Sequence, residues 1–203
     1  MLLELTWLLG VLTLGLLSPG PDFLLVVTNS VGGSRRRAFG TVAGIATGLA
    51  AQMLVISLGL AAAPPAVLRA VQLGGAAFLA WLGLRALLAA PRELETAPLT
   101  ASPGARSGFA EGLLCNLTNP KAFLFFVGLF AQTVRADSPL LWRVAVPVIV
   151  VLHGAVLWSL VVLAVQAPPV ISRLVRAQRW LPRAFGGALL ALAAWVAWGA
   201  GRG

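Results

Sequence analysis

Six long apolar segments dominate this sequence and constrain its fold more than any other feature. A helix that crosses the roughly 30 Å hydrocarbon layer of a membrane needs about 20 apolar residues, and all six segments have about that length. Only 10% of the 203 residues are charged, whereas soluble domains carry about 25%. We therefore expect one all-α membrane domain over residues 1–203, with six transmembrane helices. The segments cover approximately residues 5–30, 38–62, 67–90, 108–133, 142–166 and 182–200.

The arginines fall mostly in alternate links between these segments, which predicts the orientation of the chain. Ten lie in the first, third and fifth links, and four lie on the opposite side. Basic residues near span ends resist translocation, so we expect the arginine-rich links inside the cell and both termini outside it, in a multi-pass protein of the inner (plasma) membrane. The ten are Arg35, Arg36, Arg37, Arg85, Arg92, Arg106, Arg173, Arg176, Arg179 and Arg183, and the four are Arg69, Arg135, Arg143 and Arg202.

The net charge of +9 indicates a membrane partner rather than nucleic acid. In a soluble protein this charge would suggest a nucleic-acid partner, but these bases lie between apolar segments, where they are typical topology signals. In the fifth link, Arg173, Arg176 and Arg179 fall on one helical sector, and Leu174 and Val175 fall on another. This pattern predicts a short helix on the inner membrane surface that anionic lipid helps to hold, with a topology anchor favoured over a regulatory device.

Two glycine pairs indicate an internal repeat. Gly74-Gly75-Ala76 opens the body of the third segment, and Gly186-Gly187-Ala188 opens the sixth. A unit of three spans is odd, so a second copy enters the membrane with opposite polarity. We therefore expect two inverted repeats, at about residues 1–90 and 108–203, joined by a polar link over 91–107. The pairs Gly74-Gly75 and Gly186-Gly187 are then expected to occupy equivalent packing positions, so leucine at Gly75 or at Gly187 should hinder close helix approach.

The first apolar segment contains Ser18-Pro19-Gly20-Pro21-Asp22. The two prolines remove two backbone donors, so the helix is expected to break there. Unwound backbone at membrane depth is tolerated only where it is buried in protein or lines a wet cavity. An ionised carboxylate at the centre of a membrane helix costs about 2.5–3.5 kcal/mol, so Asp22 needs a partner, water or a proton. A structural proline kink, with Asp22 as the cap of the second half-helix, is the alternative.

The fourth segment contains Asn116-Leu117-Thr118-Asn119-Pro120-Lys121. Asn is a good N-cap and Pro is favoured at the first helical position, so a half-helix is expected to begin at Pro120 with its positive dipole end toward a break. Lys121, the only lysine in the chain, suits pairing with Asp22 or with a substrate carboxylate. The alternative is that Lys121 extends to the membrane interface or only neutralises Asp22.

Together the two motifs resemble the LysE/RhtB family of amino-acid exporters. The likeness covers nearly the whole chain and includes the glycine-rich, arginine-bearing stretch over residues 32–40. It implies an inner-membrane secondary transporter that exports basic or neutral amino acids or their derivatives by proton antiport. It also implies a substrate site at the two motifs, while the sequence leaves the particular amino acid open. The substrate-site residues are Pro19, Gly20, Pro21, Asp22, Asn116, Asn119, Pro120 and Lys121.

Three further positions have alternative interpretations. His153 lies near the middle of the fifth segment, and Gln52 is at a roughly equivalent position in the second. His153 therefore joins Asp22 as a candidate for proton coupling. The favoured alternative is that His153 is a hydrogen-bonded histidine of the core. Cys115 is the only cysteine, and its apolar surroundings favour a small core residue. Glycines at every fourth position of the second segment predict a smooth face for close helix packing: Gly40, Gly44 and Gly48.

Other function classes have less support. An intramembrane enzyme needs a nucleophile with a base, a carboxylate dyad or a metal shell, and one His, one Cys and a single deep acid supply little of this. Export of a metal cation or another small solute on the same fold is the alternative, but a divalent cation prefers more oxygen or imidazole ligands than Asp22 and His153 offer. We expect no catalytic residues, no bound metal and no cofactor. A homo-oligomer remains compatible with the sequence.

Overall fold

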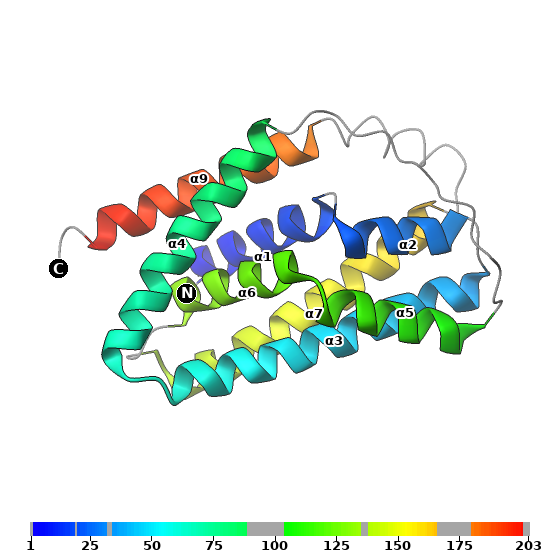
Figure 1. The fold of residues 1–203 in the computed structure, drawn as a ribbon, viewed down its shortest axis with the longest axis horizontal. Coiled ribbons are helices and arrows are strands. Elements are labelled where there is room, and N and C mark those ends of the chain that lie inside the picture. Colours follow the sequence, from blue (N-terminus) through cyan, green and yellow to red (C-terminus); the bar gives the residue numbers. More distant parts are fainter. Residues whose placement is uncertain are drawn as a thin grey trace.

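All regular elements in the described part of the chain are α-helices, as the hydropathy predicts (Figure 1). The computed structural model describes residues 2–18, 20–31, 34–88, 104–134, 138–165 and 180–200. The surface helix predicted around Arg173–Arg179 lies outside these residues. The helices are α1 (Leu2–Leu17), α2 (Pro21–Val31), α3 (Arg35–Ala61), α4 (Pro65–Leu88), α5 (Ala105–Leu117), α6 (Pro120–Thr133), α7 (Leu140–Val165) and α9 (Leu181–Ala200).

Several of these helices are long and apolar enough to cross a membrane. Among the described residues, α3, α4 and α7 meet that requirement alone, and the number rises to five if α1 with α2 and α5 with α6 each form one bent span. The two pairs are bent by 64° and 60° at their short breaks. Large apolar side chains such as Leu58 and Leu152 are exposed on the outer faces of α3 and α7, which is what a lipid-facing surface requires.

Two apolar cores lie on either side of the helix breaks. One core combines α1, α4, α6 and α9 with parts of α3 and α7 and includes Leu12, Leu79 and Phe126. The other combines α2 with the remaining parts of α3 and α7 around Phe23 and Trp158. In Figure 1 the α1–α2 break and the α5–α6 break both lie near the middle of the molecule, while α4 and α9 run side by side at one edge. The breaks therefore separate two well-packed regions.

Helices α3 and α5 touch through their backbones. A Cβ added at Gly44 would meet the backbone oxygen of Phe109, and one added at Gly112 would meet the backbone oxygen of Thr41. The predicted close-packing face of α3 is thus confirmed, and its partner is α5. The facing helix supplies glycines of its own at the same four-residue spacing, Gly108 and Gly112.

The expected equivalence of Gly75 and Gly187 is wrong. A Cβ at Gly75 would lie 2.9 Å from the Cα of Gly128 on α6, whereas nothing lies within 4 Å of one at Gly187. In α9 the preceding residue, Gly186, meets the backbone of Gly83 on α4. Because consecutive residues of a helix point about 100° apart, a shift of one residue turns Gly187 away from the contact.

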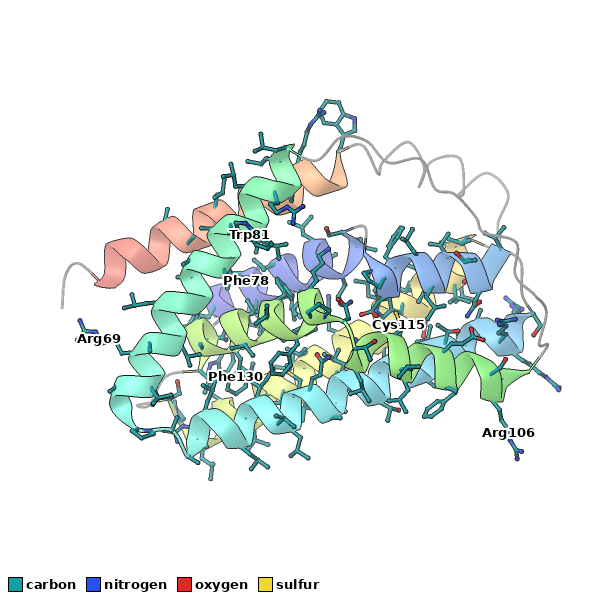
Figure 2. The ribbon with its side chains drawn as sticks, viewed as in Figure 1. Arg69, Phe78, Trp81, Arg106, Cys115 and Phe130 are labelled. Atoms are coloured by element: carbon teal, nitrogen blue, oxygen red, sulfur yellow. The ribbon has the colours of Figure 1, made fainter. Side chains whose placement is uncertain are left out.

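The two ends of the molecule's long axis carry different arginines. Figure 2 shows Arg69, at the start of α4, and Arg106, at the start of α5, at opposite ends, with Cys115 between them. Arg69 belongs to the group predicted outside the cell and Arg106 to the group predicted inside. Arg69 and Arg106 therefore lie at opposite ends of the long axis, as expected if successive helices cross the membrane in alternate directions.

Candidate functional site

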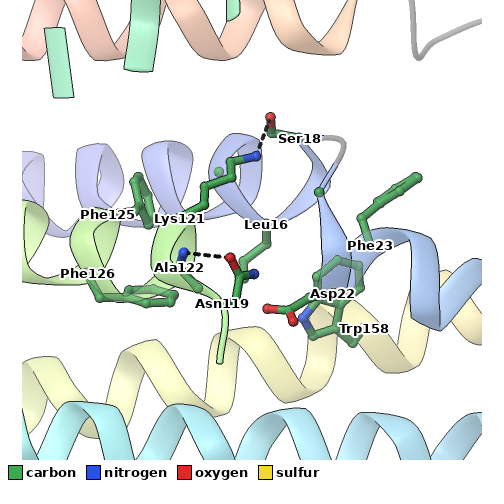
Figure 3. A pocket seen from close by; sticks show the side chains of 12 residues that line it. Leu16, Ser18, Asp22, Phe23, Asn119, Lys121, Ala122, Phe125, Phe126 and Trp158 are labelled. Atoms are coloured by element: carbon green, nitrogen blue, oxygen red, sulfur yellow. Dashed lines mark hydrogen bonds between the residues drawn. The ribbon is translucent and has the colours of Figure 1, made fainter. Parts of the chain in front are cut away.

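A small, partly open cavity lies where the two helix breaks meet (Figure 3). Four of the predicted site residues line it, namely Gly20, Asp22, Asn119 and Lys121. The remaining lining residues come from α1, α2, α6, α7 and the first break, and most of them are apolar. They are Gly15, Leu16, Ser18, Phe23, Ala122, Phe125, Phe126 and Trp158.

Two helices begin at this cavity, and each begins with a proline. Pro21 is the first residue of α2 and Pro120 is the first residue of α6. Asn119 is the N-cap of α6, because its side-chain Oδ1 accepts a hydrogen bond of 3.2 Å from the backbone N–H of Ala122. Asp22 and Lys121 are therefore both the second residue of a helix, facing one cavity from different elements.

The helix dipoles act differently on these two charges. The amino end of a helix carries partial positive charge, which stabilises an anion and opposes a cation. Asp22 is thus favourably placed at the start of α2, whereas Lys121 at the start of α6 adds its charge to a positive end. A bound anion near Lys121 would be attracted by the ammonium and by the helix end together.

The Asp22 carboxylate is buried, with 7% of the residue exposed, and is held by the end of α5. Asn116 Nδ2 donates to one carboxylate oxygen at 2.9 Å, and Cys115 Sγ donates to the other at 3.3 Å. Gln52 of α3 in turn donates from Nε2 to the backbone oxygen of Asn116 at 2.8 Å. Asn116 is therefore positioned behind the cavity, where it orients Asp22.

Lys121 has a different partner from Asp22. Its Nζ donates to Ser18 Oγ across a distance of 3.2 Å, which ties α6 to the first break (Figure 3). Ser18 itself is buried at the end of α1. The ammonium and the carboxylate thus line one cavity while each is held by its own hydrogen-bonding neighbours, and this arrangement presents opposite charges to any molecule between them.

The other predicted residues are placed as follows. Pro19 lies outside the described residues, and Pro21 and Pro120 begin their helices without lining the cavity. His153 Nε2 lies 2.9 Å from Thr13 Oγ1 of α1, in a hydrogen bond whose direction depends on the imidazole tautomer. That contact agrees with the hydrogen-bonded core histidine favoured from the sequence.

Several residues at the site are not predicted from the sequence, and Cys115 and Trp158 are the most informative of them. Cys115 was assigned to the apolar core, yet it contacts Asp22; its position directly before Asn116 in the second motif was the available signal. Trp158 lines the cavity from α7, and no pattern in the sequence around it indicated this role.

A second buried polar cluster joins α2, α3 and α5. Arg37 Nη2 and Glu111 Oε1 form an ion pair of 2.8 Å, with the Arg37 side chain 6% exposed and the Glu111 side chain 33% exposed. Asn29 Nδ2 donates to Glu111 Oε2 at 3.0 Å and to Thr41 Oγ1 at 2.8 Å. Arg37, which the sequence assigns only to membrane orientation, therefore also joins α3 to α5 through Glu111, and Asn29 of α2 binds the same carboxylate.

The described residues contain no group of three or more His, Cys, Asp and Glu side chains that could hold a metal ion. The charged groups at the cavity are one carboxylate and one ammonium, together with a capped helix end. Such a set matches a small zwitterion better than an ion of a single sign.

Comparison with known proteins gives a consistent set of relatives. Residues 13–199 match a family described as LysE type translocator. The chain is 34% identical over 185 residues to the threonine efflux protein of Escherichia coli (strain K12), covering 87% of this chain and 88% of that protein. It is 34% identical over 131 residues to the homoserine/homoserine lactone efflux protein of Salmonella typhimurium (strain LT2), covering 63% of each. No solved structure matches the chain.

Proposed function

The chain belongs to the family of LysE type translocators, which makes it an amino-acid exporter and not an enzyme, and we propose that it exchanges a neutral amino acid for a proton at the cavity between α2 and α6. The single observation that carries this proposal is the placement of Asp22 and Lys121 on one cavity with separate partners. The apolar helices and the efflux relatives support a multi-pass protein of the inner membrane.

In this proposal the substrate's two charged groups meet complementary groups. The ammonium binds the Asp22 carboxylate, and the substrate carboxylate binds Lys121 and the amino end of α6, which Asn119 caps. Both substrate charges must lose water at membrane depth, so each needs a protein charge in return. Gly20 lies close to the Lys121 ammonium, where a side chain would occupy space that the substrate carboxylate needs.

Neutral substrates fit the cavity better than basic ones. Among the described residues that line the cavity, Asp22 is the only acid and Lys121 is the only base, so the second cation of a basic amino acid would have no partner among them. Most of the remaining wall is apolar and includes Phe125 and Phe126. Two relatives, the threonine efflux protein and the homoserine/homoserine lactone efflux protein, also point to neutral amino acids.

Proton coupling follows from the use of one carboxylate for two purposes. When Asp22 takes a proton, it loses the charge that holds the substrate ammonium, so entry of a proton favours release of the amino acid. When the proton leaves, the carboxylate can bind the next substrate. Exchange at this one group is sufficient for antiport. His153, hydrogen-bonded to Thr13, is the second candidate for carrying the proton.

The same proposal includes the arrangement of the chain in the membrane. We assign six spans in two inverted repeats, at about residues 1–90 and 108–203, with the first and fourth spans broken at their proline motifs and both termini outside the cell. The supporting features are the bends of 64° and 60° between consecutive helices and the shared position of Asp22 and Lys121 directly after a helix-starting proline. Substrate sites at the repeat interface are common in such transporters.

The test is export from proteoliposomes loaded with a panel of amino acids under an imposed pH gradient. Asp22→Asn should abolish proton-driven export, and Lys121→Ala should weaken substrate binding, with insertion and yield unchanged. Glu4→Gln, a substitution of an exposed acid in the first turn of α1, is the matched control and should export at the wild-type rate. Wild-type export by both cavity variants would overturn the site assignment.

A charge exchange gives a finer test. A simple structural ion pair would tolerate Asp22→Lys combined with Lys121→Asp, because the attraction between the side chains is preserved. A site oriented by the two helix ends would not, since the backbone dipoles keep their direction when the side chains are exchanged. Export by the doubly exchanged variant at the wild-type rate would therefore contradict the proposed role of the helix ends.

A further inference from the structure

Trp158 is a fixed part of the cavity wall. It lies on α7, it is 1% exposed, and it is among the largest fully buried side chains in the described part of the chain. Its ring packs against Phe23 with the centroids 6.2 Å apart and the planes tilted by 57°. Figure 3 shows Trp158 next to Asp22, with the indole nitrogen on the side of the ring that faces the carboxylate. Packing therefore fixes where its one polar atom lies.

The indole N–H of Trp158 is buried and has no hydrogen-bond partner among the described residues. Buried tryptophans usually place this group on an acceptor. Trp142, on the same helix, does so, since its Nε1 donates to the backbone oxygen of Thr133 at 3.0 Å. An unsatisfied donor is costly unless something supplies an acceptor, and at the wall of a binding cavity a substrate can supply it.

The charged groups of the substrate already have partners in the proposed function, on which this inference rests. The ammonium is assigned to Asp22 and the carboxylate to Lys121 and the amino end of α6. The group left over is the substrate's side chain, and the wall around it offers Phe23, Phe125, Phe126 and the indole N–H. A hydrogen-bond acceptor in that side chain, such as an oxygen, would satisfy the N–H.

We propose that Trp158 is a specificity-determining residue whose indole N–H donates to a side-chain hydroxyl of the transported amino acid. The cavity would then prefer hydroxylated neutral amino acids to hydrocarbon amino acids of the same shape. Threonine and valine form the sharpest pair, because they differ by a hydroxyl in place of a methyl. A site with a donor for a substrate hydroxyl rejects the analogue that lacks it, since its own donor is then left unpaired.

The experiment compares threonine and valine efflux from proteoliposomes for the wild type and Trp158→Phe. Phenylalanine keeps an aromatic ring against Phe23 and removes the N–H. We expect the wild type to prefer threonine, and we expect the variant to lose about tenfold in the ratio of threonine to valine kcat/KM, as for the loss of one neutral hydrogen bond. Valine efflux should stay within about twofold of the wild type, because valine never used the N–H.

Two controls separate hydrogen bonding from packing. Trp142→Phe removes an indole N–H from the same helix at a place away from the cavity, and it should leave the threonine to valine ratio unchanged. Replacement of Trp158 by benzothienylalanine, which has sulfur in place of the N–H and keeps the two-ring shape, should reproduce the loss of selectivity even if the smaller phenylalanine ring disturbs folding.

The outcomes distinguish this inference from the proposed function. If the benzothienylalanine protein keeps the wild-type ratio, or loses threonine and valine efflux equally, the N–H does not contact the side-chain hydroxyl and the inference is wrong. Equal losses would mean that Trp158 supports Asp22 or the fold instead. If the wild type exports neither threonine nor valine but exports another neutral amino acid of the panel, this inference fails alone; if it exports no amino acid of the panel while insertion and yield are normal, the proposed function fails as well.

Discussion

At the scale of single residues, the most informative contact is the one between Cys115 and Asp22. The thiol donates to the carboxylate that is proposed to bind both substrate and proton, from a position 93 residues further along the chain. A neighbour of this kind affects transport through the orientation of Asp22 without touching the substrate. Cys115 is also the only cysteine, so thiol chemistry can address this one site.

We predict that Cys115→Ser preserves export and that Cys115→Ala reduces it by about threefold to tenfold. Serine keeps a donor for Asp22, whereas alanine leaves Asn116 as its remaining partner, and a net hydrogen bond is worth about 0.5–1.5 kcal/mol. The measurement is kcat/KM for efflux from proteoliposomes with matched protein content. Equal rates for the two variants would show that the thiol contact has no part in transport.

A small neutral thiol reagent provides an independent prediction. N-ethylmaleimide should inhibit the wild type slowly and faster at alkaline pH, because the thiol that donates to Asp22 must first lose its proton. The adduct at Cys115 then adds bulk beside Asp22, and saturating substrate should slow the inactivation further. Cys115→Ser is the matched control and should be insensitive. Inactivation of both proteins, or of neither, would contradict the contact between Cys115 and the transport site.

What the sequence could reveal about the site depends on how unusual each residue is in its surroundings. Asp22 and Lys121 were identified because charges are expensive within apolar segments, and Asn119 because capping follows a local rule. Cys115, Trp158 and Phe126 are ordinary residues for a helix core, and they become part of a site only through tertiary packing. Arg37 was likewise indistinguishable from Arg35 and Arg36 until Glu111 was placed beside it.

At the scale of helices, the backbone contact between α3 and α5 gives the clearest prediction. Gly44→Ala should destabilise the protein, because the new Cβ would meet the backbone of Phe109, and overpacking costs about 1–3 kcal/mol. Gly59→Ala on the same helix has nothing within 4 Å of its Cβ and should be neutral or slightly stabilising. Thermal unfolding in detergent should show a lower Tm for Gly44→Ala alone; equal Tm values would contradict direct backbone contact.

The ion pair between Arg37 and Glu111 connects the same two helices and leads to a separate prediction. Arg37→Met should lower the free energy of unfolding by about 1–3 kcal/mol, because the Glu111 carboxylate loses its charged partner in a partly buried setting. Arg36→Met, an exposed neighbour, should stay within about 0.5 kcal/mol. The check is denaturant unfolding in detergent, extended to Glu111→Gln and the double variant. Additive effects of the two single substitutions would argue against the pair.

The helix boundaries show which parts of a helix a hydropathy profile predicts and which parts it misses. The second apolar segment was placed at 38–62, whereas α3 begins at Arg35, because Ser34 caps the helix by accepting from the backbone N–H of Arg37. A hydropathy profile excludes this polar first turn although the backbone is already helical. The pairing of α3 with α5 could not be predicted for another reason. The glycine spacing predicts a close helix contact, but it does not indicate which helix is the partner.

At the scale of the whole molecule, the distribution of arginines predicts the orientation in the membrane. A reporter fused after Gly203 should be periplasmic, and one inserted near Thr100 should be cytoplasmic. Neutral replacement of Arg35, Arg36 and Arg37 together should give mixed insertion or lower abundance. The reverse reporter pattern would invert the assigned orientation, and unchanged topology with normal yield in the triple variant would show that the later arginines dominate.

Asp22 and Lys121 occupy the same position after a helix-starting proline, yet their charges are opposite. This difference has a genetic consequence. In the two-repeat arrangement proposed above, identical copies of one half would place the same residue at this position in both halves. The opposite charges of the proposed site then require the two copies to differ at the corresponding codon, so a gene fused from two first halves would lack the cation and should not substitute for the natural one.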